Sequence, residues 1–397
     1  MTRFRLGVSC ALLVLLAFLA PSWPQAASDY RALEPGLDYK HETKADGPFS
    51  IHVLRIDRTK TNWQWCAPLG EVRIMGLSPV TKIAKATEDW QKARAVAAIN
   101  GDWFEIKAGP YQGDPRGLQI VEGELVSAPA RGHCVFWVDP KGNPYMGEIE
   151  SRLGVIWPDG KTETPLGLNE QRPDAKAVLY TPALGHKPSA FKSARDSTKT
   201  TSGRELLLEP NDAKNWLPFK AGKTYSARIA AVREAGDTPL GPNTVVLSLG
   251  PNLLKSLPKS AVGDSLTLKL ETSPDLKGVR TALGGGLHLV KAGKEHPLDK
   301  VDKDRHPRSL FGWNQTHYFL VVVDGRQPKL SVGMSYKEMA ALAVRLGCTE
   351  AMALDGGGSS TLWADRRVLN SPSDGQPRAV ANALILLERK TLPPPKK

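Results

Sequence analysis

The spacing of apolar and polar positions predicts a chain of short strands interrupted by two helices. Apolar runs of strand length occupy residues 48–57, 71–75 and 95–99. A helix is predicted to begin at Pro79, because Ser78 suits the N-cap and proline is favoured at the first helical position. The inner face of that helix would carry Val80, Ile83, Thr87 and Trp90. The N-terminal part therefore combines strands with a helix.

The same combination returns in the C-terminal part. Residues 318–323 are almost wholly apolar, which predicts a buried strand. A helix is predicted over 336–346, where Ser335 as N-cap and Glu338 three residues later complete a capping box. A second strand is predicted at 351–354. Strand, helix and strand in this order predict a βαβ unit, in which the two strands run parallel.

Residues 134–278 have a different pattern. Short β-like runs recur there between polar and glycine-rich turns, and no strong helix is evident. We interpret this stretch as a β-rich insertion or second domain. Residues 28–133 and 279–388 then form the two parts of one catalytic core, and the predicted fold class is α/β (α+β) with a mixed sheet. A chain of 397 residues can bury one large core or two ordinary ones.

The two ends of the chain differ from the rest. Arg3 and Arg5 precede an apolar run over 6–20 and then small residues, a pattern that predicts a signal peptide over residues 1–27 and a secreted or periplasmic protein. The alternative is an uncleaved anchor, but the run is shorter than the roughly 20 residues of a membrane span. No other membrane-spanning candidate is evident. Residues 389–397 are predicted to be a basic, proline-rich tail.

Composition narrows the choice of partners. A hydrophobic share of 41% and a charged share of 24% are globular values. The net charge of +12 is spread thinly, without a Lys/Arg block in the folded part, which argues against nucleic acid and fits anionic envelope polymers or phosphorylated glycans. Cys66, Cys134 and Cys348 permit at most one disulfide, whose pairing stays open, and their isolation argues against a zinc cluster.

Polar residues follow the ends of several predicted strands. Asp324 and Asp355 end the two strands of the βαβ unit, each followed by a glycine. If the strand at 95–99 joins the sheet in the same sense, Asn100 and Asp102 reach the same edge. Open α/β sheets place ligands at the carboxyl ends of their strands. Each carboxylate also has a simpler interpretation, since Asp324 could belong to a hairpin turn and Asp355 could only cap the loop after it.

Three consecutive glycines, Gly356, Gly357 and Gly358, follow Asp355 and precede Ser359 and Ser360. Such a run is a poor structure former, so it suggests that the backbone passes close to a ligand or points several N–H groups one way. A tight crossing without ligand is the alternative. The loop lacks the Lys-Ser/Thr ending of a P-loop and the Gly-x-Ser-x-Gly pattern of a nucleophile elbow, so the serines fit better as hydroxyl donors than as nucleophiles.

Arginines supply candidate positive charge. Arg308 follows a proline directly before a β-like segment, which suits bidentate capture of phosphate or carboxylate, and Arg326 and Arg378 could add positive charge. The alternative for Arg308 is a solvated basic loop. Trp103 and Trp363 could stack on sugars, although core packing is the commoner use of tryptophan.

Several of these motifs occur in one order along the chain: Asn100-Gly101-Asp102-Trp103-Phe104, Gly284-Gly285-Gly286, Arg308-Ser309, Val323-Asp324-Gly325-Arg326, Leu354-Asp355-Gly356-Gly357-Gly358-Ser359-Ser360 and Asn370-Ser371-Pro372-Ser373-Asp374-Gly375. The set resembles the phosphodiester glycosidase family. Its members include N-acetylglucosamine-1-phosphodiester alpha-N-acetylglucosaminidase, the uncovering enzyme, and bacterial exopolysaccharide-related proteins. The likeness covers roughly 80–130 and 280–388. Asp102 and Trp103 stand where many relatives have glycine and phenylalanine, so the identity of the sugar cannot be transferred.

The resemblance implies a secreted or periplasmic hydrolase that cleaves the sugar C1–O bond of a glycosyl phosphodiester. Asp324 and Asp355 would supply the two carboxylate functions, in an order that stays open, and Arg308 would neutralise the phosphate. The expected substrate-binding residues are Asn100, Asp102, Arg326, Gly356, Gly357, Gly358, Ser359 and Ser360. No cofactor is required, and a divalent metal is compatible with the carboxylates but not demanded by their spacing. The alternative function is a non-catalytic binder of envelope glycans.

Overall fold

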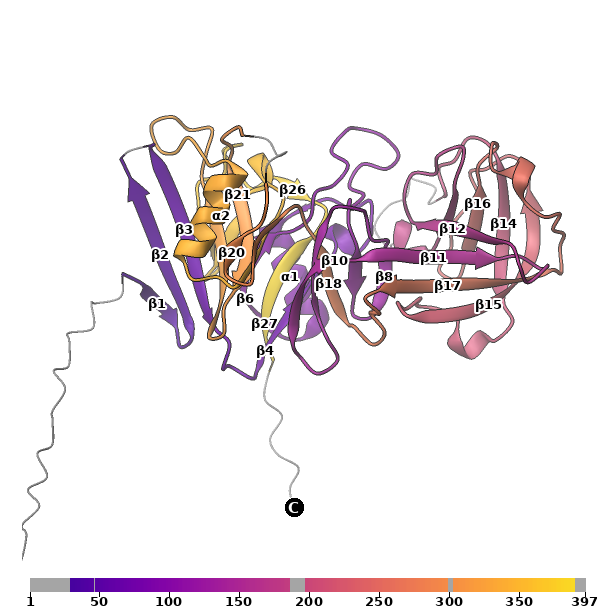
Figure 1. The fold of residues 1–397 in the computed structure, drawn as a ribbon, viewed down its shortest axis with the longest axis horizontal. Coiled ribbons are helices and arrows are strands. Elements are labelled where there is room, and N and C mark those ends of the chain that lie inside the picture. Colours follow the sequence, from indigo (N-terminus) through magenta and orange to yellow (C-terminus); the bar gives the residue numbers. More distant parts are fainter. Residues whose placement is uncertain (1–28, 46, 186–196, 299–302, 390–397) are drawn as a thin grey trace, which may run out of the picture.

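The computed structural model describes residues 29–45, 47–185, 197–298 and 303–389. The predicted signal peptide and all but the first residue of the predicted tail lie outside the described residues. The described chain has a mixed α and β fold dominated by strands, with a layered core at one end and a closed seven-stranded barrel at the other (Figure 1). Within these ranges, no helix is long and apolar enough to cross a membrane.

The largest sheet of the core has eight strands in the order β1-β2-β3-β22-β21-β23-β19-β20. They are β1 (Arg31–Glu34), β2 (Leu37–Lys44), β3 (Phe49–Asp57), β19 (His288–Lys291), β20 (Lys294–Glu295), β21 (Arg308–Trp313), β22 (His317–Val323) and β23 (Glu350–Ala353). Helix α2 (Tyr336–Arg345) covers one face of this sheet through Met339 and Leu342. Its predicted capping box is present, because the Ser335 hydroxyl accepts from the Glu338 N–H and the Glu338 carboxylate accepts from the Ser335 N–H.

The predicted βαβ unit is present only in outline. Strand β22, helix α2 and strand β23 follow in the predicted order, but β21 lies between the two strands and pairs antiparallel with both. Strands β22 and β23 therefore run in the same direction without being neighbours. The reason is that β21 and β22 form a hairpin, which occupies the position beside β22. The carboxyl ends of β22 and β23 still reach the same edge of the sheet.

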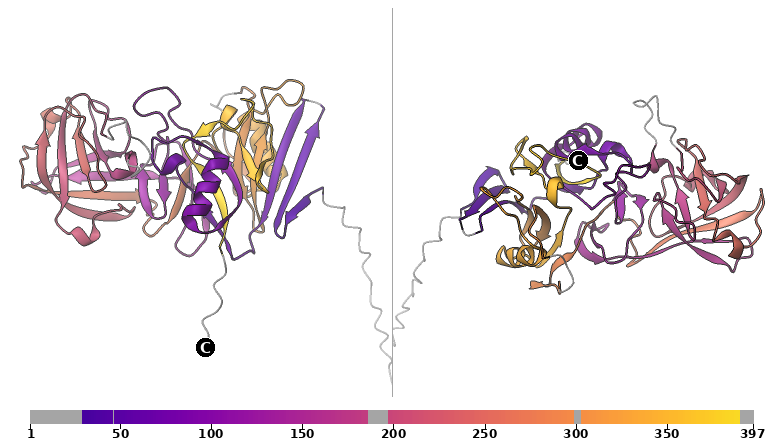
Figure 2. Two further views of the ribbon diagram at one scale, coloured as in Figure 1. Left: turned by 180° about the vertical axis from the view of Figure 1, so that it is seen from behind. Right: turned by 90° about the horizontal axis from the view of Figure 1, so that it is seen from above.

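A second core sheet has the order β25-β24-β6-β27-β4. It consists of β4 (Trp63–Cys66), β6 (Arg94–Asn100), β24 (Leu362–Ala364), β25 (Arg367–Val368) and β27 (Ala383–Glu388). The strand expected at 95–99 therefore belongs to this sheet and not to the first one. The facing sides of the two sheets enclose one apolar cluster, which includes Leu54, Ile99 and Phe311. Helices α1 (Val80–Gln91) and α2 lie on opposite sides of this core (Figure 2).

Helix α1 (Val80–Gln91) differs from its prediction in two ways. Ser78 does not cap it, because Ser78–Pro79 forms the short strand β5 and pairs with β26 (Ala379–Val380), so that Pro79 is the N-cap. Trp90 is 46% exposed instead of lying on the inner face. The strand predicted at 71–75 is also wrong, since the chain there forms the 3-10 helix η1 (Gly70–Val72) and a turn. In these places tertiary pairing overrides the local pattern.

A third sheet, of order β10-β9-β18-β7-β8, connects the core to the barrel. Its strands are β7 (Gln119–Val121), β8 (Glu124–Ser127), β9 (Cys134–Val138), β10 (Pro144–Glu148) and β18 (Thr281–Gly284). The first strands of the segment predicted as an insertion thus belong to this sheet, because β9 pairs with β18 of the core and β10 pairs with β9. The predicted hairpin with its turn at Glu122-Gly123 is β7–β8.

The barrel closes in the order β11-β12-β13-β16-β14-β15-β17. Its strands are β11 (Glu150–Ile156), β12 (Glu163–Leu168), β13 (Ala177–Tyr180), β14 (Arg204–Pro210), β15 (Lys223–Arg233), β16 (Val245–Leu249) and β17 (Ser265–Ser273). Short 3-10 helices interrupt its loops: η2 (Pro182–Leu184), η3 (Ala213–Asn215) and η4 (Leu254–Ser256). Alternate residues of β17, Leu266, Leu268 and Leu270, fill its interior.

The three cysteines of the described chain are all buried and free. Burial raises the pKa of each thiol, to about 12 for Cys66 and for Cys348. They are packing residues and not nucleophiles, since a reactive cysteine needs an accessible, electropositive setting.

Candidate active site

Asn100 links the strand ends at the edge of the core where the predicted residues meet. Asn100, at the end of β6, donates from Nδ2 to the Asp355 carbonyl at 2.7 Å. Its Oδ1 accepts from the Ser309 hydroxyl at 2.7 Å and from the Thr361 N–H at 3.1 Å. In addition, the Asp355 N–H donates to the Gly101 carbonyl at 2.8 Å. The ends of strands from two sheets therefore converge here, and Asn100 is a buried structural link between them.

Asp355 lines a pocket of about 360 Å³ at this edge. The other lining residues are Trp103, Phe104, Ile106, Arg116, His133 and Arg378. Arg378 is paired with Asp374 at 2.8 Å, and Arg116 is paired with Glu105 at 2.8 Å. The pocket thus combines one carboxylate, two guanidinium groups and aromatic surface.

The electrostatic setting of Asp355 is unusual for a carboxylate. Burial raises its pKa to about 6, while the Ser359 side chain, the Gly356 N–H and the charges of Arg378 and Arg308 oppose that shift. The Gly356 N–H donates to Oδ1 at 2.9 Å. A carboxylate with a pKa near the working pH can exchange a proton readily, which is the property expected of a general acid or base.

Asp102 lies beside this pocket in a fully buried position, only 1% exposed. Its Oδ2 accepts from the Gly117 N–H at 2.6 Å. Burial raises its pKa well above the ordinary value, and the negative charge of Asp355 acts in the same direction. Gly284, from the second glycine triplet, makes room for this carboxyl group, because a Cβ there would lie 2.8 Å from Oδ2. Burial and the neighbouring Asp355 charge therefore both disfavour the ionised form of Asp102.

Asp324 has a different environment. Its side chain is unexposed, and Oδ2 lies 2.9 Å from the Ser50 hydroxyl and 2.9 Å from His52 Nε2. Its Oδ1 accepts from the Ser371 N–H at 2.9 Å and from Asn370 Nδ2 at 3.2 Å. Four hydrogen-bonding groups thus surround this carboxylate, and it is not among the residues that line the pocket.

Arg308 begins β21, where it pairs with Val323 at the end of β22. Its Nε donates to the Met334 carbonyl at 2.8 Å, its Nη2 donates to the Asp304 carbonyl at 3.0 Å, and its guanidinium stacks 3.8 Å from the Tyr336 ring. The side chain is buried and lies outside the pocket lining, although its charge still lowers the pKa of Asp355. Arg326 is exposed.

The triglycine loop forms the short 3-10 helix η5 (Gly357–Ser359). The Gly356 N–H faces its own Asp355 carboxylate, and the Gly357 N–H donates to the Pro307 carbonyl at 2.8 Å. Gly357 has a φ of 61°, a conformation that favours glycine. A Cβ at Gly358 would collide with the guanidinium of Arg378 and the carboxylate of Asp374. The glycines therefore serve close packing around the pocket as well as backbone geometry.

The remaining predicted residues differ in whether they are buried in the core or line the pocket. The Ser359 and Ser360 side chains are buried under the loop, at 0% and 2% exposure. Trp363 is a core residue that packs with α1, whereas Trp103 lines the pocket.

Two pairs of residues at or near the site were missed by sequence reasoning. His133 and Arg116 carry no local signal. Ser50 and His52 did carry one, since they are polar residues on the inward face of an otherwise apolar strand.

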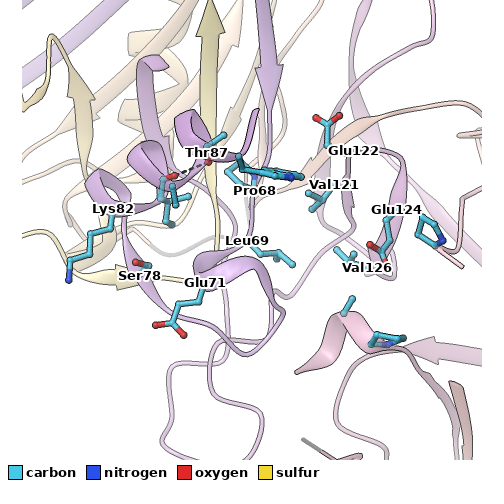
Figure 3. Close-up of a pocket in the computed structure, with 16 residues that line it drawn as sticks. Pro68, Leu69, Glu71, Ser78, Lys82, Thr87, Val121, Glu122, Glu124 and Val126 are labelled. Atoms are coloured by element: carbon cyan, nitrogen blue, oxygen red, sulfur yellow. Dashed lines mark hydrogen bonds between the residues drawn. The ribbon is translucent and has the colours of Figure 1, made fainter. Parts of the chain in front are cut away.

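A larger cleft lies elsewhere, at the junction of core and barrel (Figure 3). It has a volume of about 560 Å³, and its walls come from α1, the β7–β8 hairpin and barrel loops, with Glu71, Glu122 and Glu124 among the lining residues. None of the predicted site residues lies in it. In the part of the chain that the structure describes, no group of three or more His, Cys, Asp and Glu residues is arranged to hold a metal ion.

Comparison with known proteins finds one family model that matches part of the chain and several structures of similar fold. Residues 225–387 match the family model described as phosphodiester glycosidase, a match that begins inside the barrel. The SPbeta prophage-derived uncharacterized protein YomE of Bacillus subtilis (strain 168) is 33% identical over 115 residues, which are 28% of this chain and 18% of that protein.

Two solved structures share most of the fold. A hypothetical protein from Synechocystis matches with a TM-score of 0.69 and 19% identity, over 89% of this chain and 62% of its own. A protein from Burkholderia pseudomallei K96243 matches with a TM-score of 0.62 and 21% identity, over 86% of this chain and 74% of its own. At these identities the likeness concerns the fold alone. The chain spans less than two thirds of the Synechocystis protein and about a fifth of the prophage protein.

Proposed function

We propose that the protein hydrolyses the bond between a sugar C1 and a phosphodiester oxygen, a proposal supported by the match of residues 225–387 to the phosphodiester glycosidase family model. The products are the free sugar and a phosphomonoester. The observation that carries this proposal is Asp355, a largely buried carboxylate with a pKa raised to about 6, in a pocket that also holds two arginines and an aromatic wall.

The chemistry needs a carboxylate close to the anomeric carbon. The transition state of glycosyl transfer resembles an oxocarbenium ion, which a nearby negative charge stabilises. We assign this role to Asp355 in its ionised form, where it stabilises the positive centre or activates the attacking water. A phosphomonoester leaves readily, so the leaving group needs charge neutralisation more than protonation.

Arg378 and Arg116 are the proposed phosphate contacts. Both line the pocket, and each has a carboxylate partner that keeps its guanidinium in place. Arginine suits this role because its planar donors match phosphate oxygens. Trp103, on the same pocket, offers an apolar surface against which a sugar ring can pack. In this proposal Arg308 acts on the site through its charge and through the loops it holds.

Two further carboxyl groups take supporting roles in the proposal. Asp102 is the buried carboxyl group beside the pocket, and the Asp355 charge helps to raise its pKa, so the ionised form of Asp355 favours protonation of Asp102. Asp324 is a positioning residue, because all its hydrogen-bonding capacity is used by residues of β3 and of the segment after β25. Both assignments differ from the expectation that Asp324 and Asp355 share the chemistry.

The proposed substrate is a phosphorylated glycan outside the cytoplasm. The predicted signal peptide supports secretion or a periplasmic location, and the arginines of the pocket support an anionic substrate. We propose no particular sugar, since Asp102 and Trp103 depart from the motif of many relatives.

The test is turnover of a sugar-1-phosphodiester by the purified chain that begins at residue 28. Asp355→Asn should reduce the rate at least about a hundredfold, a loss typical of removing a carboxylate that acts in the transition state. Asp365→Asn is the matched control, because Asp365 lies in an exposed turn after β24, where its carboxylate pairs with Arg367 at 3.6 Å. Full activity of Asp355→Asn would refute the assignment. Glycan binding without turnover across a panel of phosphodiesters would instead support the non-catalytic binder.

A further inference from the structure

The wall of the pocket is formed largely by one loop, residues 103–117, here named the site loop. It leaves the end of β6 and returns toward β7, and it contributes Trp103, Phe104, Ile106 and Arg116 to the pocket lining. Its far end contacts the barrel. A single segment thus links the proposed active site to a part of the protein that supplies none of the pocket residues.

The site loop is internally braced. The Arg116 N–H donates to the Trp103 carbonyl at 2.8 Å, and the Glu105 N–H donates to the Asp114 carbonyl at 2.9 Å. The Gly113 N–H returns to the Glu105 carbonyl at 2.8 Å, and Arg116 forms its ion pair with Glu105. These cross-links join the two arms of the loop, so a displacement at its far end is transmitted to the pocket wall.

The contact between the site loop and the barrel centres on two tyrosines. The Tyr111 hydroxyl of the loop lies 2.9 Å from the hydroxyl of Tyr180, the last residue of β13, and 2.5 Å from the Thr198 carbonyl. The Tyr180 hydroxyl also lies 2.9 Å from the Glu170 carbonyl. The two hydroxyl protons are shared among these three contacts, and either hydroxyl can be the donor between the two tyrosines. Burial raises the pKa of Tyr111 to about 12, so its hydroxyl keeps its proton at physiological pH.

The same contact is sealed by apolar packing. Tyr111 is 6% exposed and Tyr180 is fully buried. They belong to a cluster shared by core and barrel, made of Leu69, Ile74, Tyr111, Val126, Val178, Tyr180, Leu184, Leu240 and Val246. A hydrogen bond in such a dry setting is costly to lose, because the partner left behind has no water to replace it.

We propose that the barrel positions the active-site wall, with the Tyr111–Tyr180 contact as the latch that fixes the site loop. The latch sets where Trp103 and Arg116 stand in the pocket, and so it sets how tightly substrate is bound. The claim that this contact fixes the site loop concerns the fold alone, whereas the claim about substrate binding rests on the proposed function. Under the competing interpretation, the barrel is an independent module whose contact with the loop has no effect on the pocket.

The first experiment measures hydrogen exchange of peptides that cover residues 103–117 in the chain from residue 28. Tyr180→Phe keeps the ring and removes the latch hydroxyl, and we expect exchange at the Glu105 and Gly113 amides to rise about tenfold, which corresponds to about 1.4 kcal/mol. Tyr225→Phe is the control, because Tyr225 is also buried and hydrogen-bonded in the barrel, where its hydroxyl accepts from the Lys220 N–H at 2.8 Å. It should leave exchange of the site loop unchanged.

A second variant keeps the test decisive if Tyr180→Phe perturbs the barrel. Tyr111→Phe removes the other hydroxyl from the loop side. The effects of the two substitutions should be less than additive in the double variant, because both single variants break the shared Tyr111–Tyr180 contact, while each also loses a contact of its own, with the Thr198 or the Glu170 carbonyl. Unchanged exchange of the site loop in both single variants overturns the latch. Equal acceleration by Tyr225→Phe also overturns it, because that result would indicate general loosening of the barrel.

Kinetic measurements test the latch separately from the proposed function. With a sugar-1-phosphodiester, Tyr180→Phe should raise KM several-fold and change kcat little, because Asp355 belongs to a different loop. Faster exchange with unchanged KM would overturn the link from latch to substrate binding. Faster exchange in a protein with no turnover at all would leave the latch in place and refute the proposed function.

Discussion

Replacing Asp355 with asparagine is expected to abolish activity and yet make the protein more stable at neutral pH. The native protein must ionise this carboxyl group in a setting that disfavours the charge, which is why its pKa is raised from 3.8 to about 6. Asparagine has a similar shape and no charge. It keeps an oxygen that can accept from the Gly356 N–H, as Oδ1 of Asp355 does at 2.9 Å.

The magnitude follows from the pKa. A rise from 3.8 to about 6 is worth about 3 kcal/mol of stability once the group is ionised. The asparagine amide also needs a partner, which water in the pocket can supply only in part, so the expected gain is about 1–2 kcal/mol. At about 2 °C per kcal/mol for a core of this size, the melting temperature should rise by a few degrees.

The pH dependence has a definite sign. Because the folded pKa is raised, the ionisation cost is absent below the unfolded pKa of about 4, grows between about pH 4 and 6, and is complete above about pH 6. Thermal unfolding followed by circular dichroism near pH 7.5 and near pH 4.5 should therefore show the gain only at the higher pH, and Asp365→Asn should show none at either. A variant that is less stable than the parent near pH 7.5, or equally stabilised at both pH values, would refute this reasoning.

Three further predictions concern the same region. The kcat/KM for a sugar-1-phosphodiester should increase with pH and level off above an apparent pKa of about 6, because Asp355 must be ionised; an acid limb near pH 4 would contradict the assigned pKa. Asp324→Ala should lower the free energy of unfolding by about 2–4 kcal/mol in urea titrations, since the Ser371 N–H loses its acceptor and Asn370 Nδ2 keeps only its bond to the Ser360 carbonyl; a loss below about 0.5 kcal/mol would contradict that. Gly358→Ala should lower kcat/KM about tenfold or more by displacing Arg378, whereas Gly147→Ala, where a Cβ meets nothing within 4 Å, should not; equal activity of both variants would argue against Arg378 as a phosphate contact.

Local sequence was a good guide where a feature depends on residues close together in the chain. The capping box of Ser335 and Glu338 is present as predicted, and so is the β7–β8 hairpin. Local sequence was misleading where a distant segment pairs with the same residues. The local pattern predicts Ser78 as a helix N-cap, but its backbone pairs with β26, some 300 residues later. A pattern within one turn of helix carries no information about such a partner.

The candidate site divides in the same way. The sequence singled out Asp355 and its glycines, because three consecutive glycines are poor structure formers and suggest that the backbone passes close to a ligand. It also marked Asp324, with equal reason, since that residue ends a strand in the same manner. Only burial separates them, because Asp355 lines a pocket while Ser50, His52, Asn370 and Ser371 surround Asp324.

The sequence alone thus determined the strand-rich α and β character, the family resemblance and the segments that end at the site. The tertiary structure decided which sheet each strand joins, which carboxylate faces the pocket, and that a loop held by the barrel forms the pocket wall. The physical reason is the range of the interactions. Helix caps and strand patterns depend on neighbours within a few positions, whereas a raised pKa or a pocket depends on groups such as Asn100 and Asp355, which are 255 positions apart and meet only in the folded chain.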